Sequence, residues 1–301
     1  MLIANPASGK GQVKKILGSL IYVFRENGCL TNVYLTTAKG EAAKFAYDYS
    51  GDYDLLVCVG GDGTLSEVIS GLMRLDADRR PAVGYIPMGT ANDIASSLGI
   101  SKDPETAARD AVTGSPMAID IGKAGDNMFS YIAAFGAFSE VSYTTPQNTK
   151  NILGHLAYII EGVSHLPSIR THRTVVEYDD GTIDDDFIFG CVMNTLSVGG
   201  IVHFDPETVG LSDGYFEILL VKAPKNVLEY KDIIGSITSQ KFDNENIVFM
   251  HSKKARFKFD EPVAWTRDGE DGGAHTDITL ENINRAVRII VPDGGNIFFY
   301  I

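Results

Sequence analysis

An aspartate inside a glycine-rich loop is the residue whose surroundings most directly indicate a reaction. Asp62 lies in the run Gly-Gly-Asp-Gly-Thr at residues 60–64, directly after an apolar, strand-like segment at 55–59. Glycines let backbone N–H groups approach an anion, and a following helix adds its positive end. A carboxylate would repel a phosphate held there unless a divalent cation lay between them. Asp62 therefore predicts a nucleotide bound with Mg²⁺, which favours phosphoryl transfer over nucleotide storage.

Two further loops have a similar composition. Residues 5–11 read Asn-Pro-Ala-Ser-Gly-Lys-Gly, and residues 87–93 read Pro-Met-Gly-Thr-Ala-Asn-Asp. Each follows a strand-like segment, and the carboxyl ends of parallel strands gather ligands at one edge of a sheet. We therefore expect the three loops to form one phosphate-binding edge, although neither the P-loop nor the dinucleotide fingerprint is complete in them.

Any one of these loops, taken alone, is typical of a tight turn before a helix. Thr64 with Glu67, and Thr90 with Asp93, have the spacing of capping boxes, which predicts helices starting close behind them. The phosphate-binding interpretation depends on the three loops together and on the carboxylate of Asp62.

The elements that must position these loops alternate in the first part of the chain. Strand-like and helix-like segments follow one another, which predicts βαβ units and a parallel sheet. We expect strands at 2–4, 32–36, 55–59 and 82–86, and helices at 12–27, 41–49, 65–73 and 92–98.

After about Asp120 the pattern changes to strand-like segments separated by Asp-Gly turns, which predicts an antiparallel β domain. We expect strands at 174–178, 187–193, 216–221, 256–259 and 287–291, and helices at 152–166 and 225–238. The predicted domains are therefore an α/β domain at 1–121 and a β-rich domain at 122–294. A last strand at about 295–301 could return to the first domain.

The bulk composition narrows the class of partner. A length of 301 residues fits two domains. A net charge of −13 disfavours general binding to nucleic acid. The three cysteines are odd in number and lack metal-ligand spacing, which is typical of a reducing cytoplasm (Cys29, Cys58, Cys191). No leader-like segment or membrane-spanning apolar run is present, so a lipid substrate would have to be reached from solution by transient contact with the inner membrane face.

With these motifs in place, the chain resembles the diacylglycerol kinase catalytic-domain family. The matching segments are Asn-Pro-Ala-Ser-Gly at 5–9, Gly-Gly-Asp-Gly-Thr-Leu-Ser-Glu-Val at 60–68 and Gly-Thr-Ala-Asn-Asp at 89–93. Residues 133–143 and 154–158 look like the soluble bacterial members in particular. The family's later motifs are matched by Gly-Leu-Ser-Asp-Gly-Tyr at 210–215 and Asp-Gly-Glu at 268–270.

The resemblance implies a lipid kinase that uses ATP and Mg²⁺, with diacylglycerol the leading acceptor and phosphatidic acid the product. It implies an N-terminal α/β domain of the NAD-kinase and phosphofructokinase type, a C-terminal antiparallel β domain, and a nucleotide cleft between them. It assigns nucleotide contacts to Asn5, Pro6, Ala7, Ser8, Gly9, Lys10, Thr37, Gly61, Asp62, Gly63, Thr64, Leu65, Ser66, Glu67 and Thr90.

The same resemblance gives roles to the acidic residues. Glu270 would accept the proton of the lipid hydroxyl, and Asp93 and Asp120 would join Asp62 in a magnesium-linked network. A second, structural metal would be bound at Gly210, Asp213 and Tyr215 through one carboxylate and two backbone carbonyls. Without the family, Glu270 belongs to a hairpin turn, Asp93 to a helix cap and Asp120 to a strand end.

Other functions stay open from the residues alone. Phosphatidylglycerol, a prenol or a sphingoid base would each offer an apolar tail and one hydroxyl. A soluble acceptor, as in an NAD kinase, and a non-catalytic nucleotide or lipid sensor are further alternatives. The apolar stripe at 152–166 and the aromatic residues Phe135, Phe138 and Tyr143 favour a lipid mildly. A homodimer would be an unsurprising assembly.

Overall fold

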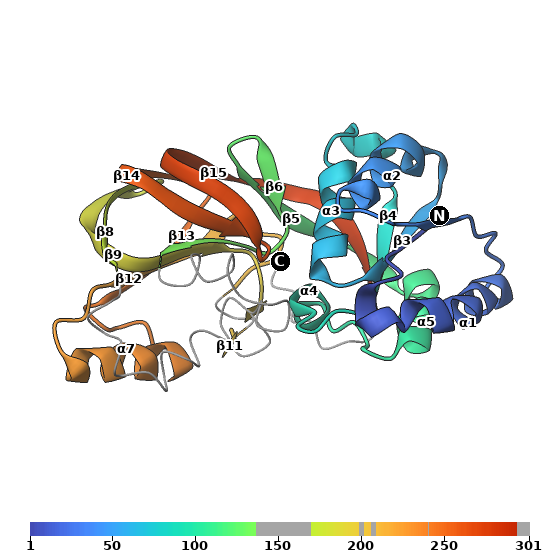
Figure 1. The fold of residues 1–301 in the computed structure, drawn as a ribbon, viewed down its shortest axis with the longest axis horizontal. Helices are drawn as coiled ribbons and strands as arrows, with labels where there is room; N and C mark the ends of the chain where they lie inside the picture. The colour runs from blue at the N-terminus through green and yellow to red at the C-terminus, as the bar shows by residue number, and fades with distance from the viewer. Residues whose placement is uncertain (137–169, 199–201, 206–208, 240, 294–301) are drawn as a thin grey trace. The chain divides into compact units, whose positions relative to one another are not determined.

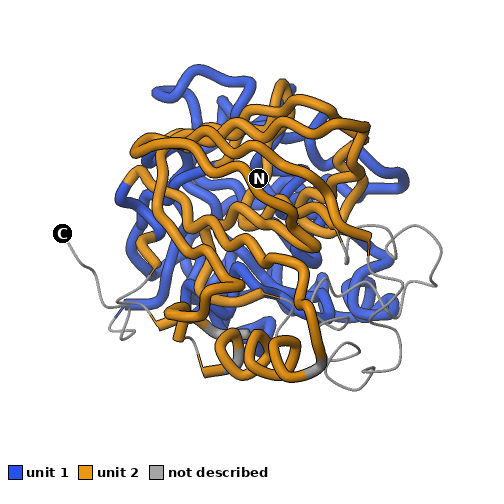
Figure 2. The backbone as a smooth tube through the Cα atoms, turned by 90° about the vertical axis from the view of Figure 1, so that its left-hand side faces the viewer, with its two compact units in different colours: residues 1–121, 211–213, 284–301 blue, residues 122–210, 214–283 orange. Residues whose placement is uncertain are grey.

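A computed structural model describes residues 1–136, 170–198, 202–205, 209–239 and 241–293. They form two compact units, coloured separately in Figure 2. Unit 1 holds residues 1–121, 211–213 and the described residues from 284 on, and unit 2 holds the remainder. After residue 121 the chain enters unit 2, and two later segments return to unit 1. The strand expected at 295–301 lies outside the described residues.

The sheet of unit 1 is parallel, as its βαβ pattern predicts. Its order is β2-β1-β3-β4, and the end of β15 lies beside β4 through the pair Ile289 and Val83. The bounds are β1 Leu2–Ala4, β2 Val33–Leu35, β3 Leu55–Gly60, β4 Ala82–Pro87 and β15 Glu270–Val291. Strands β1, β3 and β4 are almost wholly buried, as expected when helices cover both faces of a parallel sheet.

Helices cover the sheet of unit 1 in two groups, visible in Figure 1. Helix α2 packs against α3, and α1 packs against α5. The bounds are α1 Val13–Glu26, α2 Glu41–Tyr49, α3 Asp62–Leu72, α4 Asp93–Ser97 and α5 Pro104–Thr113, with 3-10 turns at Ser8–Gly11, Ser50–Asp52 and Ala77–Arg79.

Helix α5 is absent from the elements expected from the sequence. Its start is well marked, because the Asp103 side chain accepts the Thr106 N–H at 2.9 Å and Pro104 occupies the first turn. Its apolar face consists mainly of alanines, which give a weak periodic signal.

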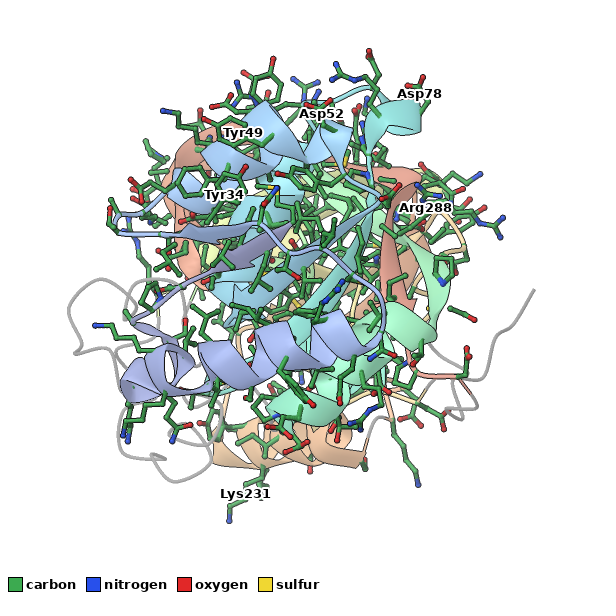
Figure 3. All side chains as sticks on the ribbon, turned by 90° about the vertical axis from the view of Figure 1, so that its right-hand side faces the viewer. Tyr34, Tyr49, Asp52, Asp78, Lys231 and Arg288 are labelled. Carbon is green, nitrogen blue, oxygen red and sulfur yellow. The ribbon has the colours of Figure 1, made fainter. Side chains whose placement is uncertain are left out.

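Aromatic side chains pack where β2 meets α2. The rings of Tyr34 and Tyr49, labelled in Figure 3, stack with centroids 5.2 Å apart. The hydroxyl of Tyr34 lies 3.2 Å from that of Tyr53, and this hydrogen bond raises the pKa of Tyr34 to about 12. The cluster attaches the three-residue strand β2 to its helix.

Unit 2 is antiparallel, as its Asp-Gly turns predict. Its strands are β6 Asn127–Phe129, β7 Ile132–Gly136, β8 His172–Tyr178, β9 Gly181–Met193, β12 Phe216–Lys222, β13 Ile247–Ser252 and β14 Lys254–Arg267. Strands β7 and β8 lie end to end between β9 and β14, because each pairs with a different half of both neighbours. A two-stranded sheet joins β10 Ser197–Val198 to β11 Val202–His203, and helix α7 spans Val227–Ser239.

Two strands belong to both units. Strand β5 (Ser115–Ala124) and strand β15 each continue from one unit into the other, so the chain crosses between the units within regular structure. Strand β5 pairs with β15 and with β6.

The core of unit 2 is aromatic. Phe135 is fully buried, with its ring centroid 5.0 Å from those of both Trp265 and Phe259. Phe135 therefore gives no support to a lipid acceptor, because its ring is enclosed by the core. Phe138, Tyr143 and the helix expected at 152–166 lie outside the described residues. In the described part of the chain, no helix combines the length and apolar character needed to cross a bilayer.

Candidate active site

The three predicted loops meet at the carboxyl ends of β1, β3 and β4. The Met88 N–H donates to the Gly60 carbonyl at 2.7 Å, which joins the second loop to the third. A Cβ on Gly61 would lie 3.1 Å from the Gly89 Cα, so the two backbones touch where only glycine leaves room. A Cβ on Gly9 would lie 3.0 Å from the Met88 side chain, which brings the first loop to the same place.

Side chains connect the first loop to the second. Asn5 Nδ2 donates to Thr64 Oγ1 at 3.2 Å, and Asn5 Oδ1 accepts the Ala7 N–H at 3.0 Å. Gly9 and Lys10 follow with φ of 59° and 55°, a left-handed pair that turns the chain into α1. Pro6, Ala7 and Ser8 complete this loop, and Lys10 is exposed.

The second loop is shorter than expected, because α3 begins at Asp62. Gly61 is the N-cap residue, and neither predicted capping box forms. Thr64 lies within the first turn of α3 with its hydroxyl on Asn5, and the third loop ends at Asn92 in the left-handed region, with φ of 56°. An extended Gly61 can end the strand and start the helix without a side-chain cap, which brings Asp62 and Gly63 into the first helical turn.

Asp62 faces the start of α4. The backbone N–H groups of Asn92, Asp93 and Ile94 lie near its carboxylate and favour the ionised form. Burial, and then the neighbouring charge of Asp93, outweigh them and raise the pKa of Asp62 to about 6. Asp62 Oδ1 is buried and accepts no hydrogen bond from the described residues. A buried carboxylate oxygen of this kind is suited to a cation.

The acidic pair fits a magnesium ion carried by a nucleotide. Within the described residues, no group of three or more His, Cys, Asp or Glu side chains could hold a metal alone. Mg²⁺ is commonly bound through one or two carboxylates together with water and phosphate oxygens, which matches Asp62 and Asp93.

Thr37 and Glu67 lie on the neighbouring loop and helix. The Thr37 hydroxyl and N–H both donate to Glu41 Oε2, at 3.0 and 2.6 Å, and these hydrogen bonds lower the pKa of Glu41. Glu67 Oε1 accepts the Gly40 N–H at 2.9 Å, which ties α3 to the loop after β2. Thr90 is exposed and Ser66 half-buried. Leu65 is fully buried, so its side chain belongs to the core, and its contact with the nucleotide stays a prediction.

Asp120 is buried within unit 1. Asp120 Oδ1 accepts hydrogen bonds from Asn284 Nδ2 at 2.9 Å and from the Arg285 N–H at 2.6 Å. These hydrogen bonds attach the returning segment to the middle of β5, so Asp120 does not lie at a strand end as its sequence context suggested. Its membership of the acidic network with Asp62 stays a prediction.

Glu270 belongs to unit 2 and is the first residue of β15. It lies opposite Arg267 across the two-residue turn Asp268-Gly269, whose φ values of 49° and 78° are both positive, as in a type I′ hairpin. The Glu270 side chain is exposed at this turn. The hairpin expected from the dipeptide is therefore present, and it presents a carboxylate to solvent.

Comparison with known proteins decides the family. The diacylglycerol kinase catalytic domain model matches residues 1–124. A diacylglycerol kinase of Bacillus subtilis is 32% identical, covering 97% of this chain and 95% of the relative, and one of Staphylococcus epidermidis is 31% identical, covering 97% and 91%. The chain belongs to the diacylglycerol kinase family. It is therefore a lipid kinase, a transferase of lipid metabolism.

A solved structure agrees with this assignment. A candidate diacylglycerol kinase from Bacillus anthracis superimposes with a TM-score of 0.82 at 26% identity, covering 97% of this chain and 94% of that one. The similarity spans both units, so the α/β unit and the β-rich unit both match a bacterial relative.

The second metal site implied by the diacylglycerol kinase resemblance stays a prediction. Asp213 is exposed in unit 1, whereas Gly210 and Tyr215 belong to unit 2. The Tyr215 carbonyl accepts Asn282 Nδ2 at 3.0 Å, and the Gly210 N–H donates to the buried carboxylate of Glu217 at 3.4 Å.

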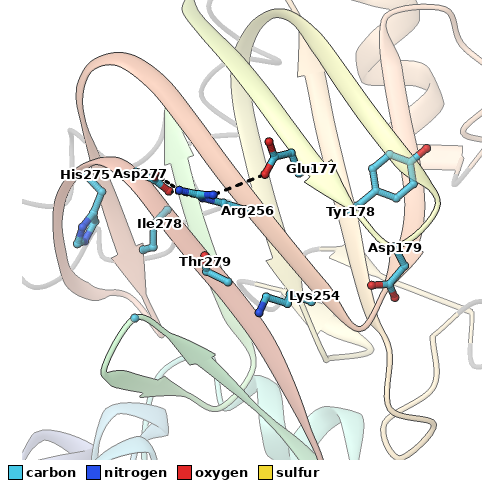
Figure 4. A pocket seen from close by; sticks show the side chains of 10 residues that line it. Glu177, Tyr178, Asp179, Lys254, Arg256, His275, Asp277, Ile278 and Thr279 are labelled. Atoms are coloured by element: carbon cyan, nitrogen blue, oxygen red, sulfur yellow. Dashed lines mark hydrogen bonds and ion pairs between the residues drawn. The ribbon is translucent and has the colours of Figure 1, made fainter.

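A hollow of about 660 Å³ on unit 2 lies outside the residues predicted for this lipid kinase. It is formed by β8, β14 and β15, and three of its charged side chains, Glu177, Arg256 and Asp277, pair with one another (Figure 4). Arg256 donates to both carboxylate oxygens of Asp277, at 2.8 and 2.6 Å, and its Nη1 lies 3.9 Å from Glu177. Such mutual pairing is typical of a solvated sheet face.

Sequence reasoning missed two residues that hold the site of this kinase in place. Asn92 exchanges two hydrogen bonds with Gly89, at 2.8 and 3.1 Å, and thereby closes the third loop. The carboxylate of Asp268, two residues before Glu270, accepts hydrogen bonds from three backbone N–H groups. Asparagine next to glycine, and Asp-Gly in a hairpin, are the signals that could have indicated both.

Proposed function

We propose that this kinase transfers the γ-phosphate of ATP to the hydroxyl of diacylglycerol and forms phosphatidic acid. The observation that carries the proposal is the buried Oδ1 of Asp62, which lies among three glycine-rich loops and has no hydrogen-bond partner within the described residues. The names of the relatives support diacylglycerol as the acceptor, ahead of another lipid, NAD or a sensor function.

Unit 1 binds the nucleotide in this proposal. Backbone N–H groups of the loops at 5–10 and 61–67, with Thr37 and Thr90, contact the phosphates and hold them in line for transfer. Asp62 and Asp93 would hold the Mg²⁺ that accompanies ATP, and the buried Asp120 would join them in the same acidic network. When bound there, Mg²⁺ would neutralise the charge that develops on the phosphate oxygens.

Unit 2 supplies the base. Glu270 takes the proton of the lipid hydroxyl while the hydroxyl oxygen forms its bond to the γ-phosphorus. The bond from that phosphorus to the bridging oxygen breaks, and ADP leaves with the electron pair. An exposed carboxylate on a defined hairpin can reach a proton carried by an incoming molecule. Because a diacylglycerol acceptor resides in a bilayer, we propose peripheral and transient contact with the cytoplasmic membrane face.

Two variants test the separation of roles. We expect Asp62→Asn to lose Mg²⁺-dependent ATP binding, measured by titration calorimetry. We expect Glu270→Gln to keep that binding while kcat falls by roughly 10² to 10⁴, the usual contribution of a positioned base. Full turnover in Glu270→Gln would remove Glu270 from the reaction, and unchanged Mg²⁺-ATP binding in Asp62→Asn would remove the metal role of Asp62.

The structural metal is a separate proposal. We propose that Gly210, Asp213 and Tyr215 bind a divalent cation through oxygen atoms that suit Mg²⁺ or Ca²⁺. Asp213→Ala should lower the melting temperature measured with divalent cation and leave the metal-free value unchanged.

A further inference from the structure

We infer that Asp268 is a positioning residue that fixes where the Glu270 carboxylate lies and in which direction it points. The inference rests on the proposed role of Glu270 as the base. Proton transfer requires an accurately placed carboxylate, and Glu270 lies on an exposed turn that needs an anchor to provide that accuracy.

The anchor consists of hydrogen bonds to one short segment. The Asp268 carboxylate accepts the N–H of Ser130 at 2.6 Å, of Tyr131 at 3.0 Å and of Ile132 at 3.2 Å. The Asp268 N–H returns a hydrogen bond to the Ile132 carbonyl at 2.9 Å. Asp268 is buried, with 5% of its surface exposed. Three amide donors around one buried carboxylate make a strong, directional attachment.

The segment that receives these hydrogen bonds is itself rigidly held. Residues 130–132 lead into β7, which pairs with β9 on one side and with β14 on the other. The paired residues next to the turn include Arg267 opposite Ala133. Asp268 therefore attaches the tip of the β14–β15 hairpin to an interior strand of the unit 2 sheet.

The two-residue turn keeps Glu270 close to this point of attachment. Only Gly269 separates the two acids, and Arg267 pairs with Glu270 directly across the turn. Arg267 adds weaker contacts from its guanidinium to the Met128 carbonyl at 3.4 Å and to the Asp271 carbonyl at 3.3 Å. Asp268 has a positive φ, and its anchor together with the pairing of Arg267 and Glu270 defines the direction of the backbone at Glu270.

The informative variant is Asp268→Asn, because asparagine keeps the size of the side chain and tolerates the left-handed region. An amide offers one acceptor oxygen where the carboxylate offers two. Its NH₂ group would therefore face either the Ser130 N–H or the pair from Tyr131 and Ile132. We expect kcat to fall roughly tenfold to a hundredfold, the loss typical of a small displacement of a reacting group. The KM for ATP should stay within about twofold, because unit 1 is unchanged.

Asp271→Asn is the matched control. It removes the same charge one residue beyond Glu270, and Asp271 is exposed with its Oδ1 on the Gly273 N–H at 2.7 Å. An electrostatic influence on Glu270 would reduce kcat equally in both variants. Positioning predicts that kcat of Asp271→Asn stays within about twofold of the wild type.

The deciding experiment combines Asp268→Asn with Glu270→Gln. If Asp268 acts through Glu270, the double variant should turn over no more than about twofold slower than Glu270→Gln alone. Hydrogen exchange at Ser130, Tyr131 and Ile132 should accelerate in Asp268→Asn and stay unchanged in Glu270→Gln.

Each other outcome has a distinct meaning. Full additivity in the double variant, or an unchanged kcat in Asp268→Asn while Glu270→Gln is impaired, would overturn the positioning role alone. Loss of ATP binding in Asp268→Asn would also overturn it, because Asp268 would then support folding in general. An unimpaired Glu270→Gln would instead overturn the proposed function of Glu270, and this inference with it.

Discussion

Asp62 experiences opposing influences in the ligand-free fold. Three backbone N–H groups favour its ionised form, whereas burial and the charge of Asp93 favour the protonated form and raise its pKa to about 6. Since an unfolded aspartate has a pKa near 4, the folded protein binds this proton more tightly than the unfolded chain does. The stability that protonation provides is complete below about pH 4 and is lost as the pH rises through about 6.

Asp62→Asn should therefore stabilise the protein at pH 7.5 without divalent cations, by on the order of 2 kcal/mol. The gain should shrink towards pH 5, where the wild-type carboxyl is protonated. Thermal melts in chelator at both pH values measure it. As a control, Asp103→Asn should lower the melting temperature at pH 7.5, because Thr106 holds the pKa of Asp103 low. A pH-independent difference for Asp62→Asn would contradict the assigned cause.

Residue-scale prediction from sequence was uneven for physical reasons. Asp62 could be identified because a carboxylate in a phosphate-binding loop needs a cation, whatever the exact geometry. The capping function of Thr64 could not be judged, because its hydroxyl is used by Asn5, a residue 59 positions away. Asp268 belongs to the Asp-Gly-Glu motif at 268–270, but its anchoring hydrogen bonds could not be predicted, since the amides that surround it come from 130–132.

At the scale of elements, the contact between the second and third loops determines the site. A Cβ on Gly89 would lie 2.8 Å from the Gly61 Cα and 2.7 Å from Asn92 Oδ1. Backbone at that distance cannot move aside as a flexible side chain would. The loops before α3 and α4 can therefore touch because neither Gly61 nor Gly89 has a side chain.

Gly89→Ala should separate these loops and raise the KM for ATP roughly tenfold or more. Steady-state kinetics at saturating lipid provide the measurement. Gly18→Ala is the matched control, because Gly18 lies exposed within α1 with open space around its missing Cβ. It should leave KM unchanged and stabilise the fold by up to about 1 kcal/mol. An unaltered KM in Gly89→Ala would show that the contact does not shape the nucleotide site.

The strands and most helices of unit 1 followed from apolar periodicity, and α2 was predicted with its observed bounds. Helix α3 begins three residues before its expected start, because an extended glycine replaces the side-chain cap. Strand β15 is much longer than the segment expected at 287–291, since charged pairs on an exposed sheet face hide its alternation.

At the scale of the whole molecule, the fold class followed from the change of pattern near residue 121, but the crossings between units did not. Residues 211–213 and those from 284 on belong to unit 1, although unit 2 surrounds the first segment in sequence and precedes the second. Their attachment depends on tertiary hydrogen bonds, such as those from Asn284 and Arg285 to Asp120. A hydrogen bond to one acceptor residue that is distant in the sequence leaves no periodic signal.

Ligand binding should be visible in the stability of the whole protein. Mg²⁺ with a non-hydrolysable ATP analogue at one hundred times its Kd should add about 2.7 kcal/mol to the free energy of unfolding, measured by denaturant titration. In Asp62→Asn the increment should fall towards the value without Mg²⁺. An equal increment in the wild type and the variant would show that Asp62 does not contribute to nucleotide binding.

The central claim is that this chain phosphorylates a lipid hydroxyl, and transfer of labelled γ-phosphate tests it most directly. Purified protein is incubated with labelled ATP and Mg²⁺, and with mixed micelles of diacylglycerol, phosphatidylglycerol or sphingosine, or with soluble NAD. We predict label in phosphatidic acid from the diacylglycerol micelles, lost in chelator and in the Asp62→Asn and Glu270→Gln variants. Label in NAD alone, or in none of the acceptors, would contradict the account.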